Sequence, residues 1–204
     1  MSRMKRVVDL TLVLLAAPLL LPAAAVVALM VRTRLGSPVI FHQTRPGLHG
    51  QPFQMRKFRS MTDARDANGQ LLSDAERLTD FGRWLRTTSL DELPGLLNVL
   101  NGEMSLVGPR PLLMRYLDRY SPEQARRHDV KPGLTGLAQV RGRNTISWDE
   151  KLALDVWYVD HRTLCLDMQI LAETAMKVLR RQDINAAGQS TMSEFMGSKN
   201  RDHQ

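Results

Sequence analysis

The segment Ser89-Leu90-Asp91-Glu92-Leu93-Pro94 places two adjacent carboxylates where the sequence predicts that a helix begins. Leucines at positions 93, 96, 97 and 100 recur at helical spacing and predict one apolar face for a helix over residues 90–100. Pro94 is early enough in this helix to be tolerated, and Asn101-Gly102 is a typical helix end. We therefore expect the acidic pair in the first turn of a short helix.

Two interpretations of the acidic pair are compatible with the local sequence. In the first, Ser89 and Glu92 form a capping box, in which both side chains bond to backbone N–H groups that the helix leaves unpaired. In the second, the helix N-terminus serves phosphate chemistry, because its free N–H groups bind anions and its field favours an ionised Asp91. An ionised aspartate can act as a nucleophile and hold a phosphoryl group as an acyl phosphate.

The composition limits the class of protein. A chain of 204 residues has room for one domain and an anchor, and its formal charge of +7 suits an anionic partner. Cys165 is the only cysteine, so an internal disulfide is excluded and a reducing compartment is indicated. The sequence has no Asp-x-Asp motif, which argues against a conventional nucleotide-sugar glycosyltransferase. The histidines show no metal-ligand spacing, and the Gly-x-Ser-x-Gly motif of serine hydrolases does not occur.

An uncharged run of 22 residues, Leu10–Val31, lies close to the N-terminus. A straight helix of that length would reach about 33 Å, enough to span a bilayer. Two features favour a re-entrant helix-hairpin over a plain transmembrane helix. Pro18 and Pro22 lie in the middle of the run, where proline removes backbone hydrogen bonds and bends a helix. Basic residues flank both ends, which by the positive-inside rule favours both on the cytoplasmic side: Arg3, Lys5 and Arg6 before the run, Arg32 and Arg34 after it.

The remaining sequence predicts a compact domain of short helices with a small β element. Strands are expected at Val39-Ile40-Phe41 and at Phe53–Phe58. A serine followed three residues later by glutamate predicts helix starts at Ser73, with a helix through Arg86, and at Ser147. A final amphipathic helix is expected over residues 166–181.

Residues 112–120 mix leucine, methionine and tyrosine with arginine, which is typical of a helix at a lipid interface. A surface helix packed on a core has the same pattern. We expect membrane contacts from this helix, in particular from Leu113 and Tyr116, and from three aromatic residues further along the chain: Trp148, Trp157 and Tyr158.

Four sequence blocks in the chain resemble those of a known family. The segments GSPVIFHQTRPG, KFRSM, LDELPGLLNVLNGEMSLVGPRP and KPGLTGLAQVRGRN are similar to the signature blocks of the monotopic phosphoglycosyl transferases, also called bacterial sugar transferases. They follow in the family's order and spacing, behind a basic hydrophobic anchor. The chain most resembles the short diacetylbacillosamine-phosphate transferases, which begin glycan assembly.

The resemblance implies a function and a set of partners. Such enzymes transfer a sugar 1-phosphate from a UDP-sugar to undecaprenyl phosphate, release UMP and depend on Mg²⁺. They work at the cytoplasmic face of the bacterial inner membrane, so membrane lipids are partners and nucleic acid is not, whereas a homodimer is left open. The implied fold is α-rich α+β, with a re-entrant membrane helix at 1–35, a catalytic domain at 36–184 and a polar tail at 185–204.

The resemblance also assigns roles to residues. Asp91 would attack the sugar-side phosphorus to form a covalent intermediate and contact the metal, and Glu92 would position or deprotonate the lipid phosphate. Four basic residues match the family positions that hold phosphates or the nucleotide: Lys57, Arg86, Arg110 and Arg143.

Two rival functions remain open from the sequence. A membrane-tethered basic protein could bind anionic lipid without catalysis, and a related membrane enzyme, such as a phosphatase, could use Asp91 on another activated phosphate. In a pure binding protein, Asp91→Asn would leave affinity intact.

Overall fold

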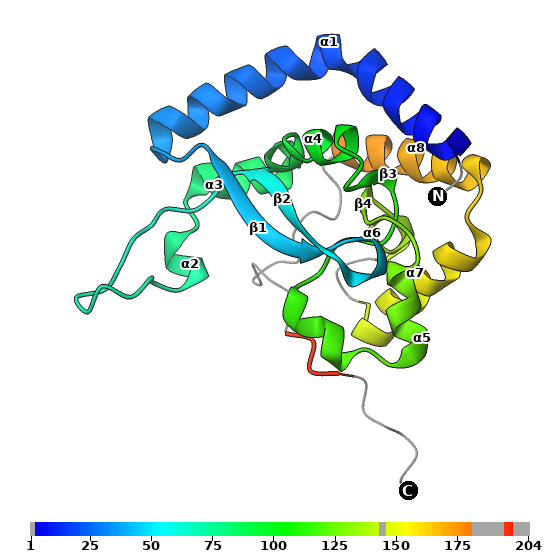
Figure 1. Cartoon of the computed structure of the whole chain (residues 1–204). Coiled ribbons are helices and arrows are strands. Elements are labelled where there is room, and N and C mark those ends of the chain that lie inside the picture. The colour runs from blue at the N-terminus through cyan, green and yellow to red at the C-terminus, as the bar shows by residue number, and fades with distance from the viewer. Residues whose placement is uncertain (1–2, 143–145, 181–193, 198–204) are drawn as a thin grey trace, which may run out of the picture.

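The predicted N-terminal helix is one continuous element, α1 (Arg3–Arg34), which contains both Pro18 and Pro22. The computed structural model describes residues 3–142, 146–180 and 194–197. Figure 1 shows α1 bent between its ends, so that it arches over the rest of the chain. Proline in a helix interior removes a hydrogen bond and bends the helix, which accounts for this shape. Within the described ranges, α1 is the one helix long and apolar enough to cross a membrane.

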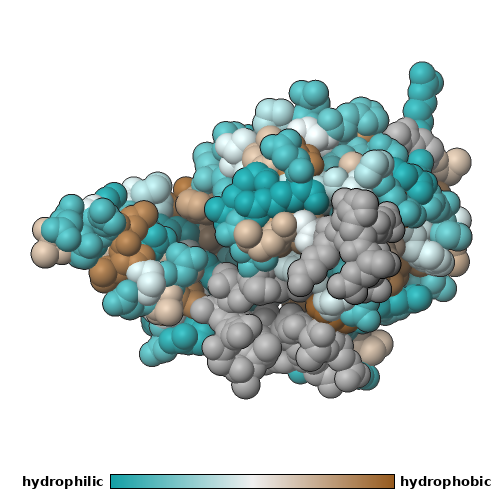
Figure 2. Space-filling model, turned by 90° about the horizontal axis from the view of Figure 1, so that it is seen from below, coloured by the Kyte–Doolittle hydropathy of each residue, from teal (hydrophilic) through white to brown (hydrophobic). Residues whose placement is uncertain are grey.

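The middle of α1 exposes its leucines instead of burying them. Leu15 and Leu19 are 73% and 77% exposed, and only 11% of the most apolar stretch of the helix is buried in the protein. Val13 packs into one hydrophobic cluster, whereas Val27 and Val31 pack into another. The face of the molecule away from α1 is largely hydrophilic where the structure describes it (Figure 2). The exposed leucines of α1 therefore give this side of the molecule an apolar surface.

Polar contacts fix the N-terminal part of α1 to the domain below it. Lys5 forms an ion pair of 2.6 Å with Asp167 of α8 (Leu164–Arg180). The buried carboxylate of Asp9 accepts a hydrogen bond of 2.7 Å from the hydroxyl of Ser105, the first residue of β3 (Ser105–Val107). This end of the helix is thus tied directly to the folded domain.

The two predicted strands form an antiparallel hairpin, β1 (Ile40–Pro46) and β2 (Pro52–Phe58), in which Phe41 pairs with Lys57. The fully buried Asn98 of α4 (Gly95–Leu100) holds β2 in place. Its side-chain oxygen accepts from the Arg56 N–H at 3.0 Å, and its amide donates to the Gln54 carbonyl at 2.7 Å. β2 is therefore fixed against α4, next to the acidic pair.

A second small sheet joins β3 in parallel to β4 (Gly133–Thr135). The backbones approach so closely that a Cβ on Gly133 would lie 2.1 Å from the nitrogen of Gly108. The N–H of Gly133 donates to the Pro109 carbonyl at 3.0 Å, which fixes the chain just before Arg110. The remaining described elements are α5 (Pro122–Ala125), α6 (Leu137–Arg141), α7 (Trp148–His161) and 3-10 turns at Leu48–Gly50, Leu90–Glu92, Met114–Arg119 and Arg126–His128. The predicted helix-rich class with a small β element is confirmed.

The helix predicted from Ser73 through Arg86 is wrong as a single element, because two helices occupy this range. Ser73 does form the predicted capping box, but α2 (Asp74–Arg77) ends at the extended Leu78. α3 (Asp80–Thr87) then begins anew, with the Thr79 hydroxyl accepting from the Gly82 N–H at 3.1 Å. A Cβ on Gly82 would lie 1.8 Å from the Ser60 carbonyl, so α3 packs directly on the backbone that follows β2. The helices predicted from Ser147 and over 166–181 are confirmed as α7 and α8.

The segment predicted as an interfacial helix, 112–120, matches the alternative of a surface element packed on a core, because Leu112 and Tyr116 belong to a hydrophobic cluster. The segment contains a 3-10 turn, and Tyr116 is only 4% exposed because its ring packs edge-on against Trp148 and Phe195. Tyr158 is 1% exposed and also has no surface to offer a membrane, whereas Trp157 is exposed. The predicted boundaries at 35 and 184 stay predictions, and most of the predicted tail lies outside the described residues.

Candidate active site

The acidic pair lies in a 3-10 turn, Leu90–Glu92, and not in the first turn of a helix over 90–100 as predicted, since α4 begins only at Gly95. Ser89 adopts a left-handed backbone conformation with φ of +56°, which costs a non-glycine residue about 1–2 kcal/mol. Its hydroxyl caps no helix, so the predicted capping box is wrong. The reason is that the Glu92 carboxylate turns away from the backbone toward two cations.

Glu92 is held between Lys57 and Arg110. Lys57 donates to Oε1 at 2.8 Å, and Arg110 forms hydrogen bonds to both carboxylate oxygens. Burial alone would raise the pKa of Glu92, but Arg110 and Lys57 outweigh it and lower the pKa to about 2. Glu92 is therefore ionised throughout the neutral range, and it fixes the directions of the two cations.

Asp91 lies in the opposite electrostatic environment. It is 8% exposed, and within the described residues its carboxylate takes part in no hydrogen bond or ion pair. Burial, reinforced by the neighbouring Glu92 charge, raises the pKa of Asp91 to about 6, against the opposing effect of Lys57, Arg110 and Arg86. The expectation that a helix field favours the ionised form is wrong in sign, because desolvation dominates. Adjacent carboxylates with well-separated pKa values are typical of catalytic pairs.

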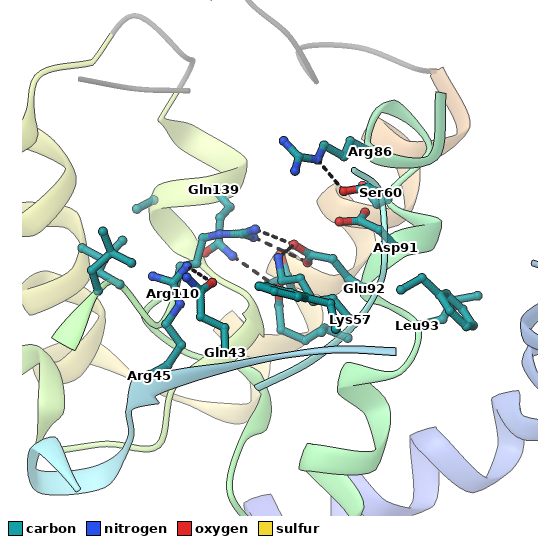
Figure 3. Close-up of a pocket in the computed structure, with 18 of the residues that line it drawn as sticks. Gln43, Arg45, Lys57, Ser60, Arg86, Asp91, Glu92, Leu93, Arg110 and Gln139 are labelled. Atoms are coloured by element: carbon teal, nitrogen blue, oxygen red, sulfur yellow. Dashed lines mark hydrogen bonds and ion pairs between the residues drawn. The ribbon is translucent and has the colours of Figure 1, made fainter. Parts of the chain in front are cut away.

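Arg86 approaches Asp91 from the side away from Glu92, as Figure 3 shows. It extends from the last turn of α3, where its Nε donates to the Ser60 hydroxyl at 2.9 Å. No carboxylate pairs with Arg86 in the part of the chain that the structure describes. Its guanidinium is thus positioned by Ser60 and remains available to an anion beside Asp91.

Five of the six side chains predicted for the site line a single cavity: Lys57, Arg86, Asp91, Glu92 and Arg110. The sixth, Arg143, lies outside the described residues. The same cavity includes polar residues that sequence reasoning missed: Gln43, Arg45, Ser60, Gln139 and Lys151. Gln43 and Arg45 alternate along β1, so their spacing could have indicated a shared face.

A divalent cation requires several oxygen or nitrogen ligands arranged around one point. The described residues contain no group of three or more acidic, histidine or cysteine side chains able to hold a metal ion. Among the described residues Glu92 is ion-paired with Lys57 and Arg110, whereas Asp91 forms no ion pair, so Asp91 can offer one carboxylate ligand. Mg²⁺ commonly uses one or two carboxylates together with substrate phosphates, and this donor set fits that pattern.

Comparison with known proteins places the chain in a family. The family model described as bacterial sugar transferase matches residues 1–181. The chain belongs to the bacterial sugar transferase family. The prediction of an enzyme, a phosphoglycosyl transferase, is confirmed at this level.

Individual members of the bacterial sugar transferase family show how far the likeness extends. The chain is 55% identical over 199 residues to an uncharacterized sugar transferase, EpsL, of Bacillus subtilis (strain 168), covering 96% of each chain. It is 42% identical over 185 residues to a UDP-glucose:undecaprenyl-phosphate glucose-1-phosphate transferase of Caulobacter vibrioides, covering 86% of this chain and 69% of the relative. It is 45% identical over 166 residues to an undecaprenyl-phosphate galactose phosphotransferase of Salmonella typhimurium, of which it spans only 35%.

Proposed function

We propose that the protein transfers a sugar 1-phosphate from a UDP-sugar to undecaprenyl phosphate and releases UMP, as the first membrane step of glycoconjugate assembly. The observation that supports this most is the buried Asp91 carboxylate, which forms no ion pair among the described residues and has a pKa raised to about 6, in a cavity lined by cations. Phosphoryl transfer depends mainly on positioning and on neutralising charge on oxygen, and arginine and lysine supply both. Two relatives are named for this class of reaction.

The first half-reaction forms a covalent intermediate on Asp91. An oxygen of the ionised carboxylate attacks the sugar-side phosphorus, the bond from that phosphorus to the bridging oxygen breaks, and UMP leaves with the electron pair. Arg86 lies beside Asp91 and can hold oxygens of the transferred phosphate. In the second half-reaction an oxygen of the lipid phosphate attacks the same phosphorus and releases the Asp91 carboxylate.

Glu92 supports this chemistry as a positioning residue. A carboxylate with a pKa of about 2 is a poor base at neutral pH, so proton removal from the lipid phosphate is not its task. Its contacts with Lys57 and Arg110 instead hold both cations toward the cavity. Asp91, together with the donor phosphates, would hold Mg²⁺, which would neutralise charge on the phosphate oxygens.

The shape of α1 supports a re-entrant membrane helix. Its apolar middle points away from the domain, while basic residues at both ends stay close to the domain (Figure 1). In this arrangement both ends lie on the cytoplasmic face of the inner membrane and the hydrophilic opposite face of the molecule points to the cytoplasm. The proline-bent middle enters one leaflet and returns.

Intact-protein mass spectrometry tests the mechanism and the donor together. Purified enzyme in detergent is incubated with Mg²⁺ and one UDP-sugar at a time, without lipid acceptor. The panel contains UDP-diacetylbacillosamine, the type of donor that the sequence resemblance indicates, and also UDP-glucose and UDP-galactose. We expect a mass gain of one sugar phosphate with a preferred donor, and no gain in Asp91→Asn.

The controls separate the rival functions. Asp118→Asn, which removes an exposed carboxylate outside the cavity, should form the adduct normally. UMP release that requires the lipid acceptor, without any adduct, would indicate direct transfer in a ternary complex. No UMP release with any donor, with or without acceptor, would refute the proposed reaction and favour a binding protein.

A further inference from the structure

The cavity extends past Glu92 to an arginine that the mechanism above does not use. Arg45 lies near the end of β1 and is half-buried, and its Nη2 donates to the side-chain oxygen of Gln43 at 2.6 Å. Its Nε is buried without a hydrogen-bond partner, and no carboxylate pairs with it among the residues that the structure describes. Figure 3 shows Arg45 and Gln43 rising from β1 below Arg110. A guanidinium in this state lacks the counter-charge that buried cations normally have.

Neighbouring cations increase the uncompensated positive charge around Arg45. Burial, followed by the charge of Arg110, lowers the pKa of Arg45 to about 10. Burial and Arg110 also lower the pKa of Lys151, which lines the same cavity from α7. Arg110 itself shares its carboxylate partner, Glu92, with Lys57. Among the described residues, Lys57 and Arg110 share one carboxylate and Arg45 pairs with none, so an anion bound between Arg45 and Arg110 would relieve the repulsion.

The position of Arg45 along β1 separates it from the membrane helix. β1 begins close to α1, because Ile40 packs on the hydrophobic cluster that contains Val27 and Val31. Lys57 pairs with Phe41 at this end, whereas Arg45 lies four residues further along the strand, roughly 13 Å away. Figure 1 shows β1 running away from α1 toward the opposite side of the molecule. A lipid phosphate must stay near the membrane, but a soluble nucleotide can reach the far end.

We propose that Arg45, together with Arg110, forms a second phosphate subsite that holds the phosphate of the nucleotide leaving group. This proposal rests on the proposed function. When the bond between the sugar-side phosphorus and the bridging oxygen breaks, the electron pair stays on that oxygen, which becomes a terminal oxygen of UMP. The extra negative charge thus develops on the nucleotide, and Arg45 neutralises it. Asp91 and Arg86 then remain with the sugar phosphate on the membrane side.

Equilibrium binding of UMP and of uridine tests the subsite. Both ligands are titrated calorimetrically into wild-type protein, Arg45→Gln and the control Arg83→Gln, which removes an arginine outside the cavity. Loss of one charge-assisted hydrogen-bond partner predicts that UMP binds about tenfold more weakly to Arg45→Gln, with uridine affinity unchanged. Unchanged UMP affinity, or an equal loss for uridine, would overturn the proposal.

Steady-state kinetics distinguish a subsite for the nucleotide phosphate from a subsite for the lipid phosphate. We expect Arg45→Gln to raise the KM for the UDP-sugar and leave the KM for a short-chain polyprenyl phosphate unchanged. The reverse result would assign the subsite to the lipid acceptor and overturn the proposal. A wild-type enzyme that releases no UMP from any UDP-sugar would refute the proposed function itself, whereas normal turnover with unaltered UMP affinity in Arg45→Gln would refute the subsite alone.

A measurement on the wild-type protein covers the case in which the variant does not fold. Phenylglyoxal modifies accessible arginines, and peptide mass spectrometry can follow the extent of modification at Arg45. Saturating UMP should protect Arg45 while an equal concentration of uridine should not. Equal modification of Arg45 with both ligands would contradict a phosphate contact.

Discussion

The guanidinium of Arg127 donates a hydrogen bond of 2.7 Å to the backbone carbonyl of Arg110. Arg127 is in turn paired with Asp155 of α7 at 2.6 Å, and both side chains are almost completely buried, at 1% and 2% exposure. The backbone at Arg110 is therefore held in place by an ion pair that is almost completely buried.

Replacing Asp155 by asparagine should destabilise the protein strongly. The change leaves the Arg127 charge buried without its partner, and breaking one half of a buried pair typically costs about 3–5 kcal/mol. Denaturant unfolding in detergent measures the loss. Asp160→Asn is a matched control on the same helix, because its pair with Arg126 is partly exposed and should contribute less than about 1 kcal/mol. Equal effects in the two variants would contradict this account.

Replacing Asp91 by asparagine should stabilise the protein while abolishing the adduct. The pKa of Asp91 is about 6 in the folded protein and 3.8 ordinarily, so the stability contributed by its protonated form is complete below about pH 4 and is lost as pH rises through 6. At pH 7 the neutral amide avoids this loss, which amounts to at most about 3 kcal/mol. Melting temperatures of Asp91→Asn and wild type at pH 4 and pH 7 test this prediction. If Asp91→Asn raises the melting temperature as much at pH 4 as at pH 7, burial of the Asp91 charge is not the cause of the stabilisation.

The rate of adduct formation should increase with pH through a pKa near 6, because only the ionised Asp91 is nucleophilic. Glu92→Gln removes a negative charge that raises the pKa of Asp91, so the acid limb should move to lower pH. Stopped reactions analysed by mass spectrometry across pH 4.5–8 give both profiles. An unchanged limb in Glu92→Gln would show that the two carboxylates are not electrostatically coupled.

A re-entrant α1 predicts that both of its ends react on the same side of the membrane. Single cysteines at the exposed positions Met4→Cys and Ser37→Cys are introduced into a Cys165→Ser background, because Cys165 is itself exposed. A membrane-impermeant maleimide should label neither cysteine in intact spheroplasts and both in inverted vesicles. Labelling of one end in spheroplasts and the other in inverted vesicles would establish a helix that crosses the bilayer.

Local patterns in the sequence were sufficient to predict several elements. The apolar run of α1, the alternation in the hairpin and the capping box at Ser73 each depend on residues close together in the chain. The capping box at Ser89 failed because Glu92 is engaged by Lys57, 35 residues earlier, and by Arg110, 18 residues later. The capping-box pattern considers only residues close in sequence, so it cannot predict that Glu92 binds cations from distant parts of the chain.

The residues that line the site were easier to predict from the sequence than the pKa shifts of its carboxylates. Lys57 and Arg110, which belong to the family blocks, and Arg86, which precedes the third block, all line the cavity. The sign of the pKa shift at Asp91 was wrong, because it depends on burial by residues from several elements. Likewise, Arg45 has no carboxylate partner among the described residues because Glu92 is paired with Arg110 and Asp155 with Arg127. These pairs form only in the folded chain.

The apolar N-terminal helix α1 is also a structural part of two hydrophobic clusters of the domain. Val13 fills a position beside Met104 and Ile170, and Val31 fills one beside Leu85 and Phe58. Expressing residues 36–184 alone would therefore leave two hydrophobic clusters open to water and remove the carboxylate that Ser105 binds. We therefore expect fragments that lack α1 to aggregate instead of yielding a water-soluble enzyme.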